Sequence, residues 1–394
     1  MIAYFGILLF LGVGVTIEQI NHNKRWRENY FIFSLLLLIL FFGLRGYIGY
    51  DWFSYKPNFD NVQNIMEIIK GDRRSLATGY EIGFQIYNSL IKSFTQNYFI
   101  YNLINSVVDI SILYIVIKRY SKFQLLTLLL FFGVYGVALE IDMIRNFKSI
   151  LLFLLSIEYI EKRNFPLFLL FNIVGILFHI SSILYIPMYF ILNIKWNRNL
   201  ILFLFILGNI YYISNTRIFL TVIKNYYNYL PAGIGTRLNG YFNIIPLDFP
   251  LGFSLYYFER VALFLLAWLV SDSLKNKRYG NIMLNSMYIS IFFFLYFSEF
   301  SIISMRFSLL FIYSYWFIIP MFLEILPKLP IVIFALLLAI FRLNNQINFI
   351  GSREVYSYQN ILFNAKGLNT QLEKVKSASQ FKSLGHGKEI SLLF

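Results

Sequence analysis

The sequence of 394 residues contains no cysteine and only three histidines. Without cysteine, the chain can form neither a disulfide framework nor a thiolate metal site. The histidines, His22, His179 and His386, do not show the spacing of zinc ligands. We therefore expect no metal site, and no other feature of the sequence predicts a cofactor.

The glycine-containing motifs of phosphate and nucleophile chemistry are missing as well. The absence of a Walker A string excludes a transporter driven by its own ATPase site. The absence of a G-x-S-x-G string excludes the nucleophile elbow of the α/β-hydrolases. No loop can hold a soluble nucleotide-sugar domain, so a glycosyltransferase with this sequence needs a lipid-linked donor that it reaches within the membrane.

Charged residues make up 14% of the chain, whereas soluble domains contain about 25%. Hydrophobic residues make up 58% and the mean hydropathy is +0.62, which places most of the chain in a lipid bilayer. In a soluble protein the net charge of +14 would suggest nucleic acid binding. Here many lysines and arginines fall in short loops, where they orient the spans, and we expect no nucleic acid partner.

Twelve apolar runs predict an all-α integral membrane protein with about 11–13 transmembrane helices. Residues 80–94 form a further, amphipathic segment that is more typical of a surface or re-entrant helix than of a crossing. The apolar runs are residues 1–17, 29–44, 98–117, 124–140, 146–160, 165–180, 181–194, 199–214, 252–271, 282–298, 306–324 and 329–342.

The basic residues of the short loops all fall on one side of the membrane if residues 80–94 do not cross. The positive-inside rule makes that side the cytoplasm. Two long segments, about 45–97 and 215–251, then lie on the outer side, and their length indicates a functional role. We predict a transmembrane domain over residues 1–343 and a polar tail over residues 344–394. The lysines of the tail suit the cytoplasm, whereas twelve crossings place it outside.

Ionisable and aromatic residues gather on the predicted outer face, which suggests a site for an anionic, lipid-linked substrate. Arginine supplies planar, permanently charged donors for pyrophosphate oxygens. A carboxylate or a histidine could take the proton of an attacking hydroxyl, and aromatic rings could stack on sugars. The candidates are Arg45, Tyr50, Asp51, Trp52, Glu81, Asp142, Arg145, His179, Arg237, Asp248, Glu259, Arg260, Glu299 and Arg306.

The densest group of charges is Glu140, Asp142 and Arg145, which lie within six residues between two long apolar runs. Charges in such a place are expensive and are usually functional. Asp142 and Arg145 could form no more than a neutralised ion pair. However, Arg145 opens a helix, where a cation opposes the helix dipole, so a bound anion explains it better.

Other candidates also have purely structural interpretations. Arg45 could snorkel at the end of an apolar helix, and Asp51 could cap one. Glu81 could interact with the dipole of the helix that follows it. His179 could be a hydrogen-bonded interior group, although the break at Pro187 indicates a bent or re-entrant region.

Four strings resemble the EpsG-like, Wzy-type polysaccharide polymerases, which join lipid-linked oligosaccharide repeats into O-antigen or exopolysaccharide. They are GLRGYIGYDWFSY at 43–55, GYEIGF at 79–84, the segment from IDMIRNF to YFIL at 141–192, and SMRFSLLFIYSYWFIIP at 304–320. The third is the most specific, because an arginine opens a helix, a basic turn follows, and a later helix carries Phe-His-Ile-Ser before Tyr-Ile-Pro. It departs from the family in the Asn-Phe that follows the arginine.

The resemblance implies a GT-C-like glycosyltransferase in the bacterial cytoplasmic (inner) membrane, with its active site facing the periplasm or the cell exterior. It implies metal-independent transfer of a glycan from undecaprenyl pyrophosphate to a sugar hydroxyl of another lipid-linked repeat. The implied partners are this lipid-linked oligosaccharide, membrane lipids, a chain-length regulator and a flippase.

The resemblance also assigns roles to matching residues. Arg145 and Arg306 would hold the pyrophosphate, and His179 would lie beside the phosphates or the acceptor hydroxyl. Asp51 and Glu81 would bind sugar or serve as the base. The residues that would assist in substrate binding are Arg45, Tyr50, Trp52, Asp142, Arg237, Arg260 and Glu299.

Two other classes of function stay open on sequence alone. A flippase or transporter of lipid-linked glycans would show charges along a central cavity and two related halves, whereas here the charges favour one side. A different membrane transferase is the second class. An acyltransferase would need a histidine near an aspartate or asparagine on the donor side, and an O-antigen ligase would use the same donor chemistry as a polymerase.

Overall fold

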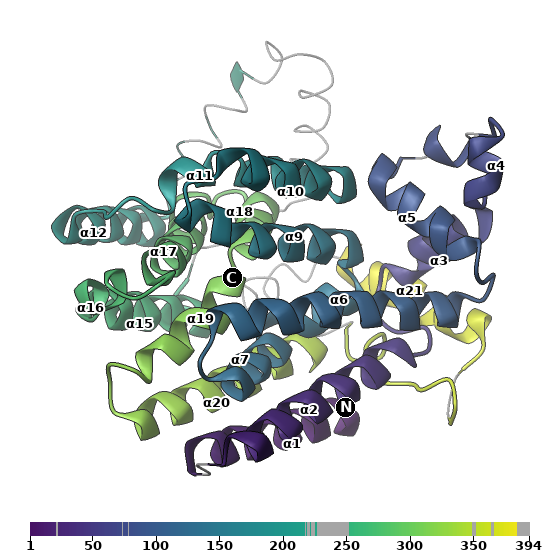
Figure 1. Cartoon of the computed structure of the whole chain (residues 1–394). Helices are drawn as coiled ribbons and strands as arrows, with labels where there is room; N and C mark the ends of the chain where they lie inside the picture. Colours follow the sequence, from purple (N-terminus) through teal and green to yellow (C-terminus); the bar gives the residue numbers. More distant parts are fainter. Residues whose placement is uncertain are drawn as a thin grey trace.

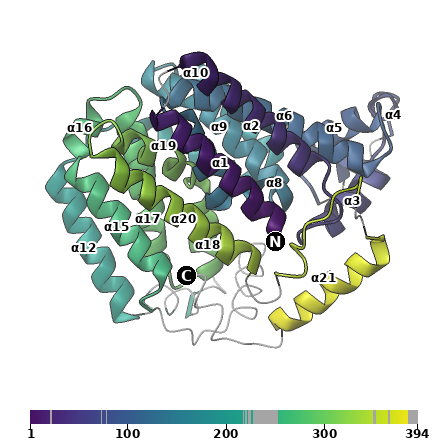
Figure 2. The same cartoon turned by 90° about the horizontal axis from the view of Figure 1, so that it is seen from below.

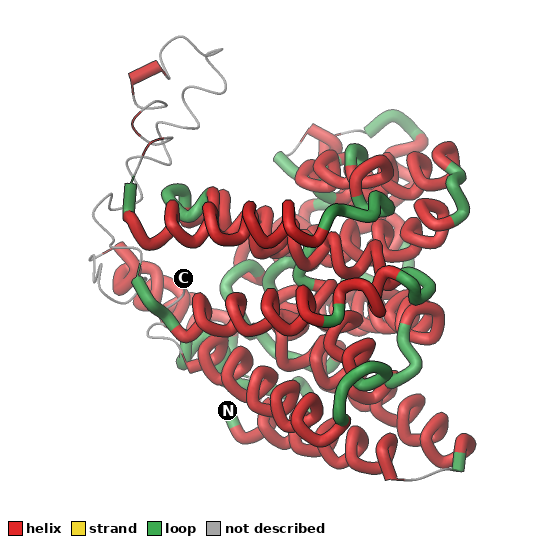
Figure 3. The backbone as a smooth tube through the Cα atoms, turned by 90° about the vertical axis from the view of Figure 1, so that its left-hand side faces the viewer, coloured by secondary structure: helices red, strands yellow, loops and turns green. Residues whose placement is uncertain are grey.

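The computed structural model describes residues 1–20, 23–72, 74–77, 79–216, 218, 221, 225–226, 252–348, 352–363 and 366–383. In this part of the chain every regular element is a helix, apart from an isolated β-bridge between Arg45 and Asn360. Many of the long helices run side by side (Figure 1, Figure 3). The all-α fold predicted from the sequence is confirmed.

Five of the described helices are long and apolar enough to cross a membrane, and four further apolar helices are shorter. The five are α1 (Ile2–Ile20), α2 (Lys24–Gly43), α6 (Tyr98–Tyr120), the broken helix Gln124–Ile141 and α20 (Lys328–Asn348). The four are α10 (Phe165–Phe178), η3 with α11 (Ile180–Ile191), α12 (Arg198–Ser214) and α17 (Gly280–Tyr296). These helices confirm an integral membrane protein.

The remaining apolar runs are helical too. The run predicted at 306–324 is divided into two helices, and the run at 181–194 begins as the 3-10 helix η3. The elements not yet named in this part of the bundle are α9 (Ile144–Glu161), α15 (Leu255–Leu269), α16 (Ser271–Lys275), α18 (Ser301–Leu310) and α19 (Tyr313–Phe322).

Asparagine starts several of the helices. Asn23, Asn97, Asn164 and Asn197 each accept a hydrogen bond from a backbone N–H in the first turn of the helix that follows. Such caps satisfy donors that have no partner within the helix. The four side chains therefore help to fix where α2, α6, α10 and α12 begin.

A broken helix forms the centre of the bundle. It consists of α7 (Gln124–Phe131), the π-helical turn η2 (Phe132–Gly136) and α8 (Val137–Ile141), and 89% of it is buried inside the protein. Val134 and Tyr135 leave helical geometry. The indole Nε1 of Trp316 in α19 donates to the Val134 carbonyl at 3.0 Å, so a tertiary contact satisfies a backbone group at the break.

One end of the bundle carries the helices of the segment 45–97, and we call this end the loop face (Figure 1, Figure 2). The helices are α3 (Trp52–Asn61), α4 (Ile65–Ile69), the 3-10 helix η1 (Arg74–Ala77) and α5 (Ile82–Lys92). The 11 residues of α5 span about 16 Å, which is too short to cross a bilayer core of about 30 Å. Most of the second long segment, 215–251, lies outside the described residues.

The C-terminal segment packs on the same loop face (Figure 2). Residues 352–363 run beside residues 44–49, where the N–H of Ile361 donates to the carbonyl of Leu44 at 2.9 Å. The helix α21 (Leu368–Ser383) buries Val375 in an apolar cluster of the loop face. Other members of this cluster are Trp52, Tyr55, Phe59, Val62 and Phe84. The part of the tail that the structure describes therefore shares its side with residues 45–97.

A charge at the buried position of α21 should detach this helix. In Val375→Asp, the carboxylate would enter the apolar cluster without a partner, so we expect several-fold faster chymotrypsin cleavage within residues 45–62 of the solubilised protein. Glu373→Ala, at an exposed position of the same helix, is the matched control. Identical cleavage patterns for the two variants would contradict this role of α21.

Candidate functional site

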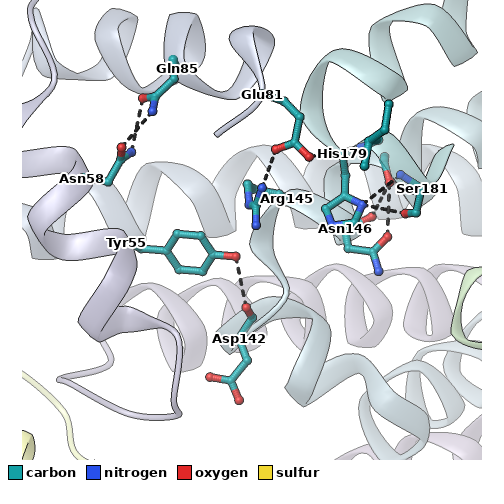
Figure 4. Close-up of polar contacts among 11 residues, drawn as sticks. Tyr55, Asn58, Glu81, Gln85, Asp142, Arg145, Asn146, His179 and Ser181 are labelled. Carbon is teal, nitrogen blue, oxygen red and sulfur yellow. Dashed lines mark hydrogen bonds and ion pairs between the residues drawn. The ribbon is translucent and has the colours of Figure 1, made fainter. Parts of the chain in front are cut away.

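The candidate site lies at the loop face, where α5, α9 and η3 meet (Figure 4). Arg145, in the first turn of α9, forms an ion pair with Glu81, which directly precedes α5. The other carboxylate oxygen of Glu81 accepts a hydrogen bond from the backbone N–H of Ile180 at 3.1 Å. One carboxylate thus joins three elements, while the side chains of Arg145 and Glu81 stay 22% and 19% exposed.

Aromatic rings line the guanidinium group of Arg145. Its Cζ atom lies 4.7 Å from the ring centroid of Tyr80 and 5.9 Å from that of Phe84, distances typical of cation–π contacts. Burial acts to raise the pKa of Glu81, but backbone hydrogen bonds and the charge of Arg145 outweigh it and lower that pKa. The ion pair is therefore fully charged at neutral pH.

His179 lies at the break between α10 and η3, beside this ion pair (Figure 4). Its Nδ1 atom is 2.6 Å from the Ser181 hydroxyl and accepts a hydrogen bond from the Ser181 N–H at 3.3 Å. Burial, then the charge of Arg145 and, less strongly, that of Arg306 lower the pKa of His179 to about 4. The ring is neutral at pH 7, and because Nδ1 accepts, Nε2 carries the proton and can donate to an anion.

Arg306 in α18 is the second arginine of the site. Its side chain is exposed, and its charge acts on the pKa of His179. The charges of Arg145 and Arg306 thus both act on His179, although the three residues are far apart in the sequence. Two permanent cations and one neutral N–H donor form an arrangement suited to an anion with several oxygens.

Asp142 holds the backbone around the site in place. Its Oδ1 atom accepts the N–H groups of Tyr50 at 2.6 Å and Asp51 at 3.2 Å, and its Oδ2 atom accepts the hydroxyl of Tyr356. Its carbonyl accepts the hydroxyl of Tyr55 at 3.3 Å (Figure 4). Asp142 therefore clamps residues 50–51 and the C-terminal segment to the start of α9. The ion pair between Asp142 and Arg145 that the sequence suggested is not formed, because Arg145 pairs with Glu81.

A glycine allows this clamp to form. Gly49 has a φ of +86°, and a Cβ atom there would lie 2.1 Å from Oδ1 of Asp142. Only glycine combines this backbone conformation with so close an approach.

The neighbouring aromatic candidates are packed into the protein. Trp52 is 4% exposed in the apolar cluster, and the half-buried Tyr50 places its hydroxyl 3.0 Å from that of Ser352. Asp51 occupies the position before α3, but its exposed side chain makes no capping hydrogen bond. Of these three predicted residues, Asp51 is the one that is exposed.

Arg45 is only 3% exposed and lies among buried polar groups. Its Nη1 atom donates to the carbonyl of Phe42 at 2.7 Å. Its charge acts on Asp109, whose carboxylate oxygens lie 2.8 and 2.9 Å from Nζ of Lys148. The sequence analysis missed Asp109 and Lys148, although each is a charge inside an apolar run.

Two further candidates, Glu259 and Arg260, lie in α15. Glu259 makes a buried, two-pronged ion pair with Arg342 of α20, a residue that the sequence analysis also missed. The Cζ atom of Arg260 lies 4.0 Å from the ring centroid of Phe294, and Glu299 is half-buried before α18. Arg237 and Asp248 lie outside the described residues, as do His22 and His386.

Within the described part of the chain, no group of three or more His, Asp or Glu side chains could hold a metal ion. The groups that gather at the loop face are instead arginines, a neutral histidine and carboxylates. This set can bind an anion and accept a proton from a hydroxyl.

A family model described as the EpsG family matches residues 28–360. The match contains all the residues of the candidate site and the part of the C-terminal segment that contacts Asp142. No curated protein and no solved structure matches the chain.

Removal of the Asp142 carboxylate should destabilise the protein. Asp142→Ala leaves one buried and two part-buried donors without an acceptor, a loss of roughly 2–4 kcal/mol, so the midpoint of thermal unfolding in detergent should fall by several degrees. Asp272→Ala removes a carboxylate that is 71% exposed and serves as the control. Equal midpoints for the two variants would rule out the clamp.

The lowered pKa of His179 predicts a change of stability with pH. At pH 5 the unfolded chain, with an ordinary histidine pKa of 6.5, binds a proton that the folded ring does not. Stability therefore falls as the pH decreases from 6.5 towards 4. Between pH 7 and 5, the wild type should lose roughly 2 kcal/mol more than His179→Gln, as measured by thermal unfolding. Parallel losses in both proteins would mean that the folded ring is protonated.

Proposed function

The chain belongs to the EpsG family, and we propose that it transfers a growing glycan from undecaprenyl pyrophosphate to a sugar hydroxyl of another lipid-linked oligosaccharide repeat. Membership of the family supports a membrane polysaccharide polymerase in general terms, and the five candidate spans agree with it. The product in this proposal is an O-antigen or an exopolysaccharide.

The position of His179 beside Arg145, under the charge of Arg306, carries the proposal. When undecaprenyl pyrophosphate leaves, negative charge builds on its bridging oxygen. Guanidinium groups in a partly dehydrated site stabilise this charge, and one well-placed donor is worth about 3–4 kcal/mol. Nε2 of His179 adds a neutral donor. The proposal is metal-independent because the arginines supply the positive charge.

Glu81 links substrate binding to proton transfer in this proposal. A diphosphate carries more charge than a carboxylate and competes with Glu81 for Arg145. The displaced carboxylate stays next to the backbone N–H of Ile180, where it can accept the proton of the attacking hydroxyl. Asp51 is the alternative base, because it is exposed and its charge acts on Tyr80, the ring that lies against Arg145.

The loop face lies at the outer leaflet of the bacterial cytoplasmic membrane in this proposal. Basic residues mark the opposite end of the bundle, where Lys122 and Lys277 both pair with Glu324, as expected for a cytoplasmic side. Lipid anchors hold donor and acceptor at the same depth, which lowers the entropic barrier of their reaction. A flippase would deliver the repeats, and a chain-length regulator would act on the product.

Loss of either Arg145 or Arg306 should stop chain growth. We expect Arg145→Gln and Arg306→Gln each to lower polymer formation by about 100-fold or more. The assay contains the purified protein in nanodiscs and a lipid-linked repeat, without nucleotide sugar, ATP or added metal, and gels report the glycan length.

Arg119→Gln is the matched control for this experiment. Arg119 also pairs with a glutamate, Glu158, at 2.8 Å, but at the opposite end of the bundle. Its polymer ladder should match that of the wild type. Wild-type ladders from Arg145→Gln and Arg306→Gln would refute the site, whereas single transfer to an acceptor other than a lipid-linked repeat would favour a ligase.

A further inference from the structure

The buried face of helix α5 carries polar residues as well as Phe84 and Ile91, and its outer face carries apolar residues. The buried Gln85 donates from Nε2 to Asn58 at 2.8 Å, and the buried Asn88 accepts the hydroxyl of Tyr101 at 3.0 Å. The exposed apolar residues are Ile82, Ile86 and Leu90. A helix on a water-facing surface exposes polar residues, whereas α5 exposes these three apolar ones, so its outer face is suited to contact with lipid.

This helix continues the lipid-facing surface of α10. With 14 residues, α10 spans about 21 Å, which is less than the bilayer core of about 30 Å. α5 lies beyond its end (Figure 1) and packs so closely that a Cβ on Gly83 would be 2.6 Å from Cβ of Leu177. Together the two helices form a longer apolar surface than α10 does alone.

The apolar surface reaches the charged site. We define the lateral strip as Ile82 and Ile86 of α5, Ile173 and Leu177 of α10, and Ile180 of η3, which are all exposed by 38% to 59%. Ile82 directly follows Glu81 in the sequence, and Ile180 follows His179 and donates its N–H to Glu81. The strip therefore ends one residue from Glu81 and one residue from His179, which both belong to the candidate site.

We propose that the polyisoprenoid chain of the lipid-linked substrate lies on the lateral strip, and that its diphosphate enters the site sideways from the bilayer, past Ile82 and Ile180. This inference rests on the proposed function and adds the path of the lipid. A ligand with an apolar chain joined to a diphosphate matches both parts, because the strip is continuous with the lipid-facing surface of α10 and ends beside Arg145. Ordinary bilayer phospholipid on the strip is the alternative outcome of the test.

Photocrosslinking tests where the chain lies. The photoreactive residue p-benzoylphenylalanine replaces Ile82 or Ile180, and replaces Ile210 of α12 as a control with the same kind of exposure to lipid, 59%. The probe is ³²P-labelled undecaprenyl diphosphate in phosphatidylglycerol nanodiscs. We expect labelling at Ile82 and Ile180 to exceed that at Ile210 at least fivefold, and excess unlabelled undecaprenyl diphosphate to compete. Equal labelling at the three positions would show bulk lipid only and would overturn the proposal.

Kinetics with two chain lengths provide an independent test. Ile82→Ser and Ile180→Ser should raise KM about fivefold for an undecaprenyl-linked repeat, because each removes apolar contact with the chain. A repeat on a two-isoprene diphosphate should show no such change, and Ile210→Ser should affect neither substrate. Equal effects on both substrates would indicate a disturbed ion pair and would overturn the lipid path.

The two proposals fail in different ways. Labelling that does not favour Ile82 and Ile180, combined with polymer growth that still depends on Arg145, would overturn the lipid path and leave the proposed function standing. Growth that does not depend on Arg145 would overturn the proposed function itself.

Discussion

The structure depends on the high cost of an unpaired charge in an apolar interior. Three ion pairs meet this constraint. Lys148 pairs with Asp109 and Arg342 with Glu259, and the side chains of both pairs are at most 6% exposed. Arg145 and Glu81 are paired as well, but about a fifth of each side chain is exposed. Of the three pairs, this one can exchange a protein partner for a ligand.

The groups around this pair are held by backbone contacts from distant parts of the chain. Asp142 receives donors from residues 50–51 and from Tyr356, and Gly49 gives it the room to do so. The C-terminal segment therefore supports the candidate site although it follows the last candidate span. A rigid support of this kind suits a site that must keep two arginines and a histidine in fixed positions.

The sequence predicted much of the fold but less of the site. All twelve apolar runs found from hydropathy are helical in the structure, because a helix satisfies its backbone groups internally in an apolar environment. Arg145 and His179 stood out as polar groups within apolar sequence. The sequence did not indicate that Glu81, rather than Asp142, pairs with Arg145, because partners distant in sequence leave no local pattern. For the same reason it did not indicate that Arg45 is buried, and it missed Arg342.

By itself, the sequence determined the class of the protein, its helices and its scarcity of charge, since these follow from each residue and its near neighbours in the chain. Tertiary structure decided which charges are neutralised for stability and which stay accessible. It also decided that residues 352–363 and 366–383 cover the loop face and that α5 turns its apolar side outwards. These features depend on distances between side chains that only the folded chain brings together.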